Sequence, residues 1–266
     1  MIMSDQETLQ LSIENHIATL TLNRPEARNA LNRLAYQELE DAFHSMQKNN
    51  DVRVIIITGT DPAFCSGDDV KELMTGDGNA GGARLRSVRP GTTPAAKAIL
   101  DCDRPIIAAV NGPAIGWGMD LSLFCDFRIA SDRAKFSEMF VRRGLVSDVG
   151  GFTRLPKIVG PQIAAELLFT GDIIDAATAL KIGLVKEVVP HNQLLETANH
   201  LASRIALNPP LAVRYLKEGL RRSYHGDYEE MGTWVSQTLA VLFKTEDHKE
   251  GVASFLEKRE PRFTGQ

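Results

Sequence analysis

Two glycine-containing segments of this chain each follow a short apolar run, and each could hold a negatively charged oxygen. One, at residues 110–126, leads from the apolar run 105–110 into an apolar helical pattern. The other, at residues 62–70, follows the apolar run 54–58. A glycine bend before a helix leaves backbone N–H groups unpaired at the helix N-terminus, where the dipole favours negative charge. Two such loops brought together would form an oxyanion hole, which needs no charged side chain.

Four motifs in order make the chain resemble the crotonase superfamily, the enoyl-CoA hydratase/isomerase group. They are L-N-R-P-E-A-R-N-A-L at 22–31, the loop at 63–70, the block at 109–126 and the segment 144–156. Several motifs in the right order are far more specific than one glycine loop. The resemblance implies an α/β fold, a crotonase-type spiral of ββα units with a C-terminal helical segment used for trimer assembly.

The resemblance also implies a ligand. Members of the family bind acyl-CoA thioesters and stabilise an enolate or tetrahedral oxyanion at the thioester oxygen. Matched motif by motif, the two backbone N–H donors of the oxyanion hole are those of Asp68 and Trp117. Relatives usually have Ala or Gly at both positions, but a backbone donor survives a change of side chain. Loss of one such donor typically costs about 2.7–4 kcal/mol of transition-state stabilisation.

The acids depart from the usual family pattern. Hydratases of the family use two glutamates, which match Asp120 and Phe140 here, and Phe140 cannot transfer a proton. Glu138 is near in sequence, but a helical shift of two residues would point it elsewhere. Asp148 stands where hydratases usually carry glycine. The dienoyl-CoA isomerases and the ring-opening isomerases have an aspartate at the matching place, and the chain resembles them there. The resemblance therefore predicts Asp148 and Asp120 as catalytic residues, with Phe140 and Gly116 in the substrate pocket.

Other interpretations stay open for these residues. Asp148 could be the N-cap of a helix over 149–155, and Asp120 could be a structural acid on a helix. The 4-chlorobenzoyl-CoA dehalogenases also pair an aromatic residue with an aspartate here, but residues 84–104 contain no match for their catalytic histidine. The favoured activity is double-bond isomerisation of an enoyl-CoA, with Asp148 moving the proton. The alternatives are water addition by Asp120 and Asp148, and a CoA-thioester binder without catalysis.

No cofactor is expected, because coenzyme A is part of the substrate. For its binding, the resemblance points to Arg28, Lys258 and Phe263, the last two often supplied across a subunit interface. The G-x-G at 116–118 lacks the third glycine of a dinucleotide motif. Three widely spaced cysteines suggest neither a disulfide framework nor a metal site.

Composition describes an ordinary globular protein of 266 residues, with 43 % hydrophobic and 24 % charged residues. A net charge of −4 argues against nucleic acid as a partner. The chain shows no signal peptide and no apolar run of about 18 residues that would span a membrane. A cytoplasmic location is therefore expected.

Periodicity predicts the elements that must position these residues. Alternating apolar residues predict a β-hairpin over 9–22, and helical spacing predicts a helix after Asn32. Short apolar runs predict buried strands at 52–58, 105–110 and 127–131.

Two later regions have different patterns. Residues 76–97, rich in glycine and proline, predict either a surface loop or a mobile wall over a pocket. The end of the chain is wholly helical, with helices expected at 193–206, 210–221, 228–243 and 247–258. We therefore expect a core with the acyl-CoA site at 1–195 and a helical segment at 196–266. The apolar surplus of that segment predicts a homotrimer or hexamer.

Overall fold

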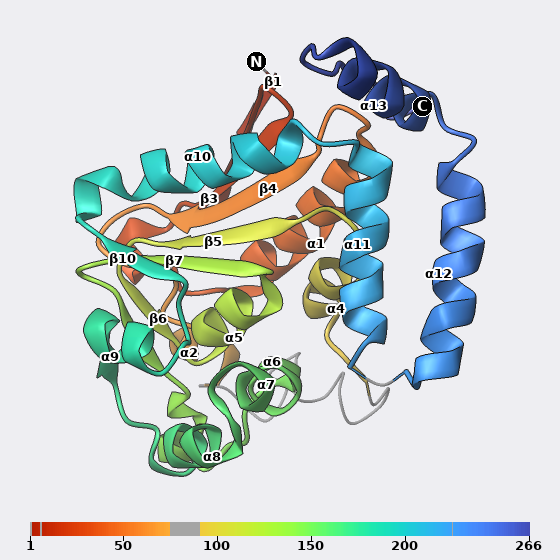
Figure 1. The fold of residues 1–266 in the computed structure, drawn as a ribbon. Coiled ribbons are helices and arrows are strands. Elements are labelled where there is room, and N and C mark those ends of the chain that lie inside the picture. Colours follow the sequence, from red (N-terminus) through yellow and green to blue (C-terminus); the bar gives the residue numbers. More distant parts are fainter. Residues whose placement is uncertain (1, 6, 75–90, 225) are drawn as a thin grey trace.

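The structure, a computed structural model, describes residues 2–5, 7–74, 91–224 and 226–266 (Figure 1). One sheet has the strand order β1-β2-β3-β4-β5-β7-β10, and a smaller sheet has the order β6-β8-β9. The strands are β1 (Ile2–Asp5), β2 (Leu9–Glu14), β3 (Ile17–Leu22), β4 (Val54–Gly59), β5 (Ile106–Val110), β6 (Pro113–Ile115), β7 (Phe127–Ser131), β8 (Lys135–Ser137), β9 (Ile174–Asp175) and β10 (Glu187–Val189).

The larger sheet begins antiparallel and continues parallel. The predicted hairpin is confirmed, with β2 and β3 paired antiparallel and Leu9 opposite Leu22. From β3 through β4, β5 and β7 to β10, neighbouring strands are parallel. Every residue of β4 and β5 is buried, as expected for apolar runs in a parallel sheet covered on both faces. The glycine loops therefore follow strands that the core holds firmly.

Helices cover both faces of this sheet. Successive side chains of a strand point to opposite faces, so Ile56 packs with α10 while Ile55 packs with the cluster that includes α1. The helices, including short 3-10 turns, are η1 (Pro25–Ala27), α1 (Arg33–Lys48), α2 (Val70–Leu73), α4 (Pro94–Asp101), α5 (Trp117–Phe124), η2 (Met139–Arg143), α6 (Val149–Thr153), α7 (Leu155–Val159), α8 (Pro161–Thr170), α9 (Ala176–Lys181), η3 (His191–Gln193), α10 (Leu194–Ala206), α11 (Pro210–Arg222), α12 (Tyr228–Leu242) and α13 (Glu246–Glu257). Asn32 caps α1 by accepting a hydrogen bond from the Ala35 N–H at 2.9 Å.

Most of the predicted loop or wall at 76–97 lies outside the described residues. Its last part differs from the prediction, because α4 already begins at Pro94. Proline favours the first turn of a helix, and Ala95, Ala98 and Ile99 are buried, with α4 packed against α1.

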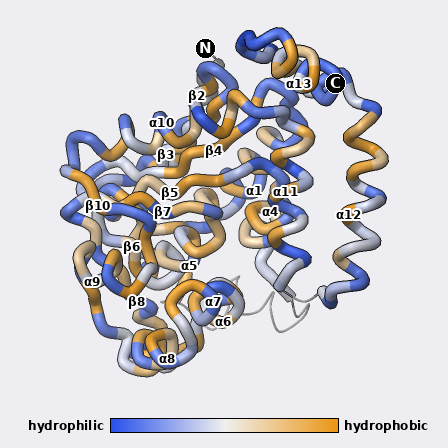
Figure 2. Tube along the Cα trace, viewed as in Figure 1, coloured by the Kyte–Doolittle hydropathy of each residue, from blue (hydrophilic) through white to orange (hydrophobic). Residues whose placement is uncertain are grey.

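The helices expected after residue 193 are confirmed, and the last two carry exposed apolar side chains. In Figure 1, α12 stands at one side of the molecule, where it packs against α11, and α13 lies at the end near β1. Apolar positions are visible along α12 in Figure 2, and Val235, Leu239 and Phe243 are exposed. Within the described ranges, no helix is both long and apolar enough to cross a bilayer.

Candidate active site

The two glycine loops lie side by side, as the sequence predicts. Cys65 pairs with Ala114 in a parallel bridge, and the Ile115 N–H donates to the Cys65 carbonyl at 2.9 Å. One step further along, a Cβ built on Gly67 would lie 3.3 Å from the backbone nitrogen of Trp117. The residue before Asp68 therefore touches the start of α5, and both candidate oxyanion donors belong to the same small region.

Glycine is required where these loops meet. Gly67 has φ of 87° and Gly116 has φ of 56°, both in the region that favours glycine. Trp117 is the first residue of α5, so the helix offers no partner for its N–H. The bend thus aims a helix N-terminus at the Gly67 loop, which is the arrangement that favours a bound oxyanion.

Phe140 and Gly116, the predicted pocket residues, are also together. A Cβ at Gly116 would lie 3.8 Å from Cζ of Phe140, so the aromatic ring sits beside the bend that leads into α5. Phe140 is only partly buried. An apolar ring, rather than a carboxyl, therefore borders this side of the site.

Trp117 joins the oxyanion region to the predicted acids. Its indole Nε1 donates to Oδ2 of Asp148 at 3.0 Å. The second oxygen, Oδ1, accepts the N–H of Val149 at 2.7 Å, so Asp148 is indeed the N-cap of α6. Asp148 therefore both caps α6 and lies beside the oxyanion region. Partly exposed, Asp148 is the more accessible of the two aspartates.

Asp120 is adjacent to Asp148. Its carboxyl accepts the N–H of Asp148 at 3.2 Å and the N–H of Gly151 at 2.7 Å, and it is completely buried. Burial above all, and then the charges of Glu138 and Asp148, raise the pKa of Asp120 well above its ordinary value. A Cβ at Gly150 would overlap Oδ1 of Asp120, so α6 can approach this acid only because that residue is glycine.

Glu138 belongs to the same cluster, contrary to the sequence-based expectation. It is not inside a helix: it follows β8 and precedes η2, with φ of −87° and ψ of 57°. A helical offset from Phe140 therefore does not describe its direction. Its Oε2 accepts the Ser147 hydroxyl at 3.0 Å, and burial raises the pKa of Glu138 to about 7. The signal available in the sequence was the apolar Phe136 two residues earlier, since residues two apart in a strand share a face.

Tyr36 is a second residue that sequence reasoning missed. Its hydroxyl donates to Oδ1 of Asp68 at 2.5 Å, and its ring meets that of Trp117 edge-on, with centroids 5.0 Å apart. Burial first, and then the Asp68 carboxylate, raise the pKa of Tyr36. Tyr36 lies on α1, 32 positions before Asp68 in the sequence, so no local pattern indicated this contact. Tyr36 therefore contacts both candidate oxyanion residues: it hydrogen-bonds to Asp68 and packs against Trp117.

The predicted CoA-binding residues are divided between two places. Arg28 is exposed, and its carbonyl accepts the N–H of Ser66, so it adjoins the 62–70 loop. Lys258 is exposed at the end of α13. In Figure 1, α13 lies at the opposite end of the molecule from α5, α6 and α7. A single chain therefore does not bring the C-terminal pair, Lys258 and Phe263, to the acids.

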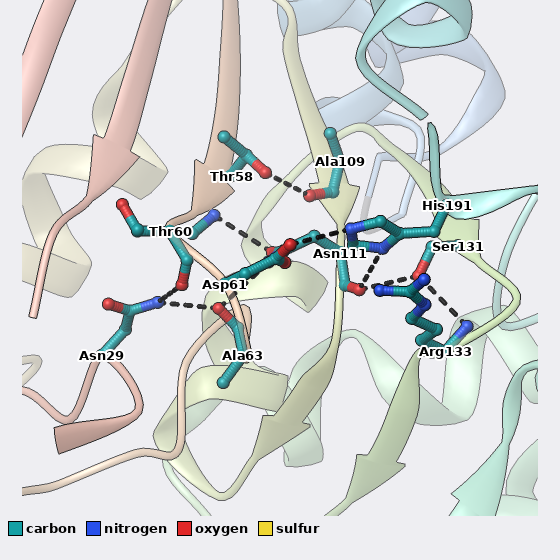
Figure 3. Close-up of polar contacts among 11 residues, drawn as sticks. Asn29, Thr58, Thr60, Asp61, Ala63, Ala109, Asn111, Ser131, Arg133 and His191 are labelled. Atoms are coloured by element: carbon teal, nitrogen blue, oxygen red, sulfur yellow. Dashed lines mark hydrogen bonds and ion pairs between the residues drawn. The ribbon is translucent and has the colours of Figure 1, made fainter. Parts of the chain in front are cut away.

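A polar network holds the base of the 62–70 loop (Figure 3). His191 contacts Oδ2 of Asp61 through Nε2 at 2.9 Å and the Asn111 carbonyl through Nδ1 at 3.1 Å. Asn111 donates to Oδ1 of Asp61 at 2.9 Å, and Asn29 donates to the carbonyls of Thr60 and Ala63. Asp61, Asn111 and His191 lie just beyond β4, β5 and β10, respectively. The network therefore fixes the loop that positions the candidate donor at Asp68.

Comparisons with known proteins identify the family to which the chain belongs. The profile of a family described as enoyl-CoA hydratase/isomerase matches residues 12–266. A crotonyl-CoA hydratase of Syntrophomonas wolfei is 37 % identical over 258 residues, covering 97 % of this chain and 98 % of the relative. An (E)-benzylidenesuccinyl-CoA hydratase of Thauera aromatica is 35 % identical over 256 residues, covering 96 % and 98 %.

Solved structures confirm the fold expected from the resemblance. The crystal structure of an enoyl-CoA hydratase from Bacillus anthracis superposes with a TM-score of 0.91 at 32 % identity, covering 98 % of this chain and all of that one. The α/β crotonase fold with its C-terminal helices is therefore confirmed, while assembly through those helices stays a prediction. The chain belongs to the enoyl-CoA hydratase/isomerase family.

Proposed function

We propose that the protein is an enoyl-CoA hydratase, which adds water across the double bond conjugated to a CoA thioester. The sequence favoured isomerisation, but the names of the relatives support hydration better. The observation that carries the proposal is the position of Trp117, which starts α5 beside Gly67 and donates its indole N–H to Asp148. Oxyanion donor and acid are thus linked through one residue.

The backbone donors would act on the thioester oxygen. With the N–H groups of Asp68 and Trp117 on that oxygen, negative charge developing during attack at the β-carbon is stabilised where it forms. Trp117 is 1 % exposed, so water competes little for its N–H, whereas Asp68 is partly buried. A low-dielectric site strengthens such hydrogen bonds.

The two aspartates differ in burial and hydrogen bonding, and we assign them different roles. Asp148 is partly exposed and accepts the N–H groups of Trp117 and Val149, so we assign it the role of taking a proton from the attacking water. Asp120 is buried with a raised pKa, which suits a carboxyl that gives a proton to the α-carbon. Environments that set two carboxyls apart in this way are typical of acid–base pairs. The cycle closes when the proton accepted by Asp148 returns to Asp120.

Isomerisation is the second candidate, and one observation favours it. Phe140 borders the bend at Gly116 where hydratases of the family have their second glutamate. With a single working acid, Asp148 would remove a proton and return it to another carbon of the enolate, with no net addition of water.

Paired variants separate the two activities. Asp148→Asn and Asp120→Asn would be assayed with a panel of enoyl-CoA thioesters, following water addition and double-bond position by mass spectrometry and NMR. Hydration predicts comparable losses in kcat for both variants, because both acids act in one turnover. A large loss for Asp148→Asn with little for Asp120→Asn would favour isomerisation. A wild-type protein that binds thioesters without turnover would contradict both.

Assembly and the CoA residues complete the proposal. We propose that copies of the chain associate through the exposed apolar faces of α12 and α13, giving a trimer or hexamer. Lys258 ends α13 and Phe263 lies against Gly251 of the same helix, and α13 is at the other end of the molecule from α5 and α6 in Figure 1. These two residues would therefore contact CoA only across such an interface, whereas Arg28 would act within the chain. The proposed division at residues 195 and 196 falls within α10, which packs on the sheet.

A further inference from the structure

Glu138 is buried beside the proposed acid pair but has no part in the proposed reaction. Its side chain is 1 % exposed. One oxygen, Oε2, accepts the Ser147 hydroxyl. The other, Oε1, is buried with no hydrogen-bond partner in the part of the chain that the structure describes. An unsatisfied buried carboxyl oxygen costs free energy, about 1–3 kcal/mol or more, so its presence calls for a functional explanation.

Glu138 and Asp120 hold the same turn. Glu138 binds the side chain of Ser147, while Asp120 binds the N–H groups of Asp148 and Gly151. The turn that carries Asp148 is therefore held by two buried carboxyls from different elements, α5 and the end of β8. Like charges so close together in a buried site do not all ionise at neutral pH. The cluster retains a proton.

Carboxyls dominate the electrostatics of this cluster. After burial, the charge of Glu138 is the largest cause that raises the pKa of Asp120, and Asp148 raises the pKa of both. Asp148 also acts on Tyr36. The other charged side chains on elements packed nearby contact different partners or are exposed: Arg154 at the Phe124 carbonyl, Lys157 at the Tyr224 ring, Arg142 at Asp172, Lys97 at Asp101, and exposed Arg143 and Glu166.

We propose that Glu138 is a positioning residue whose carboxyl keeps a proton on Asp120, so that Asp120 stays in the acid form the hydration requires. The inference rests on the proposed function. When Glu138 is ionised, its repulsion disfavours a second negative charge on Asp120. When Glu138 is neutralised, that repulsion disappears and Asp120 releases its proton at lower pH. Glu138 itself need not touch the substrate.

The pH profile of kcat tests this directly. Glu138→Gln keeps size and hydrogen bonding but removes the charge. We expect the basic limb of kcat, where the acid loses its proton, to move to lower pH by about one unit or more, with KM close to wild type. Glu138→Asp retains the charge and should retain the limb. Glu166→Gln changes the net charge equally at an exposed site and should leave the profile unchanged.

A substrate-free measurement separates this inference from the proposed function. Infrared difference titration with isotope-labelled aspartate follows the Asp120 carboxyl in the resting protein, with Asp120→Asn identifying its band. The band should disappear at lower pH in Glu138→Gln than in wild type, whether or not the enzyme hydrates enoyl-CoA. The inference would be overturned if the band disappeared at the same pH in Glu138→Gln as in wild type. It would also be overturned if kcat fell without any shift of the basic limb.

Ser147→Ala provides a second route if Glu138→Gln folds poorly. It removes the hydroxyl that lowers the pKa of Glu138, so Glu138 becomes less ionised at neutral pH. The Asp120 band should then shift in the same direction as in Glu138→Gln, by a smaller amount. A shift in the opposite direction would contradict the coupling.

Discussion

Asp148→Asn should abolish most activity while leaving the fold nearly intact. Asparagine caps a helix about as well as aspartate, so the start of α6 should hold. Asp148 accepts two N–H donors, from Trp117 and Val149, and an asparagine oxygen can replace the carboxylate at one of them. The lost hydrogen bond costs about 1–3 kcal/mol in stability.

The catalytic loss should be larger than the stability loss. Removing a general base lowers kcat by roughly 10²–10⁴-fold, which equals about 2.7–5.4 kcal/mol in the activation barrier. Steady-state hydration kinetics, thermal unfolding and calorimetric binding of a CoA thioester would be measured on the same preparation. Thioester affinity should stay close to wild type. Full turnover in a folded Asp148→Asn variant would show that the base lies elsewhere.

Three further predictions follow from the packing. Gly150→Ala should lower both the melting temperature and kcat, since its Cβ would overlap Asp120; an unchanged kcat would refute the close approach. Burial opposes ionisation of Asp61, but hydrogen bonds from Asn111 and His191 outweigh it and lower its pKa. The ionised Asp61 therefore stabilises the fold above about pH 4, and this stabilisation is lost as the pH falls below that. In Asp61→Asn, the free energy of unfolding measured in urea should depend less on pH on the acid side. Sedimentation should find no monomer at micromolar concentration.

Local sequence signals predicted the framework because each depends on neighbouring residues. The apolar runs of β4 and β5 and the glycines at 67 and 116 indicate strands and bends by their own chemistry. The resemblance then placed Asp68 beside Trp117, and the structure brings their loops together. Asp148 and Asp120 were likewise expected near each other and are hydrogen-bonded.

Residues that join the site from other elements were harder to predict. Tyr36 reaches Asp68 from α1, a contact between residues 32 positions apart in sequence. A helical offset from Phe140 points Glu138 away from the site, but Glu138 lies outside any helix, between the end of β8 and the start of η2. Such positions depend on tertiary packing and on where one element ends, and element ends are poorly specified by periodicity.

Turnover in water labelled with heavy oxygen tests the central claim most directly. Crotonyl-CoA would be incubated with the wild-type protein and with Asp148→Asn, and the thioester product would be analysed by mass spectrometry. Hydration by the site described above predicts a β-hydroxyacyl-CoA that carries the label, formed far more slowly by the variant. A rearranged enoyl-CoA that never acquires the heavy-oxygen label, across a panel of enoyl chains, would contradict it.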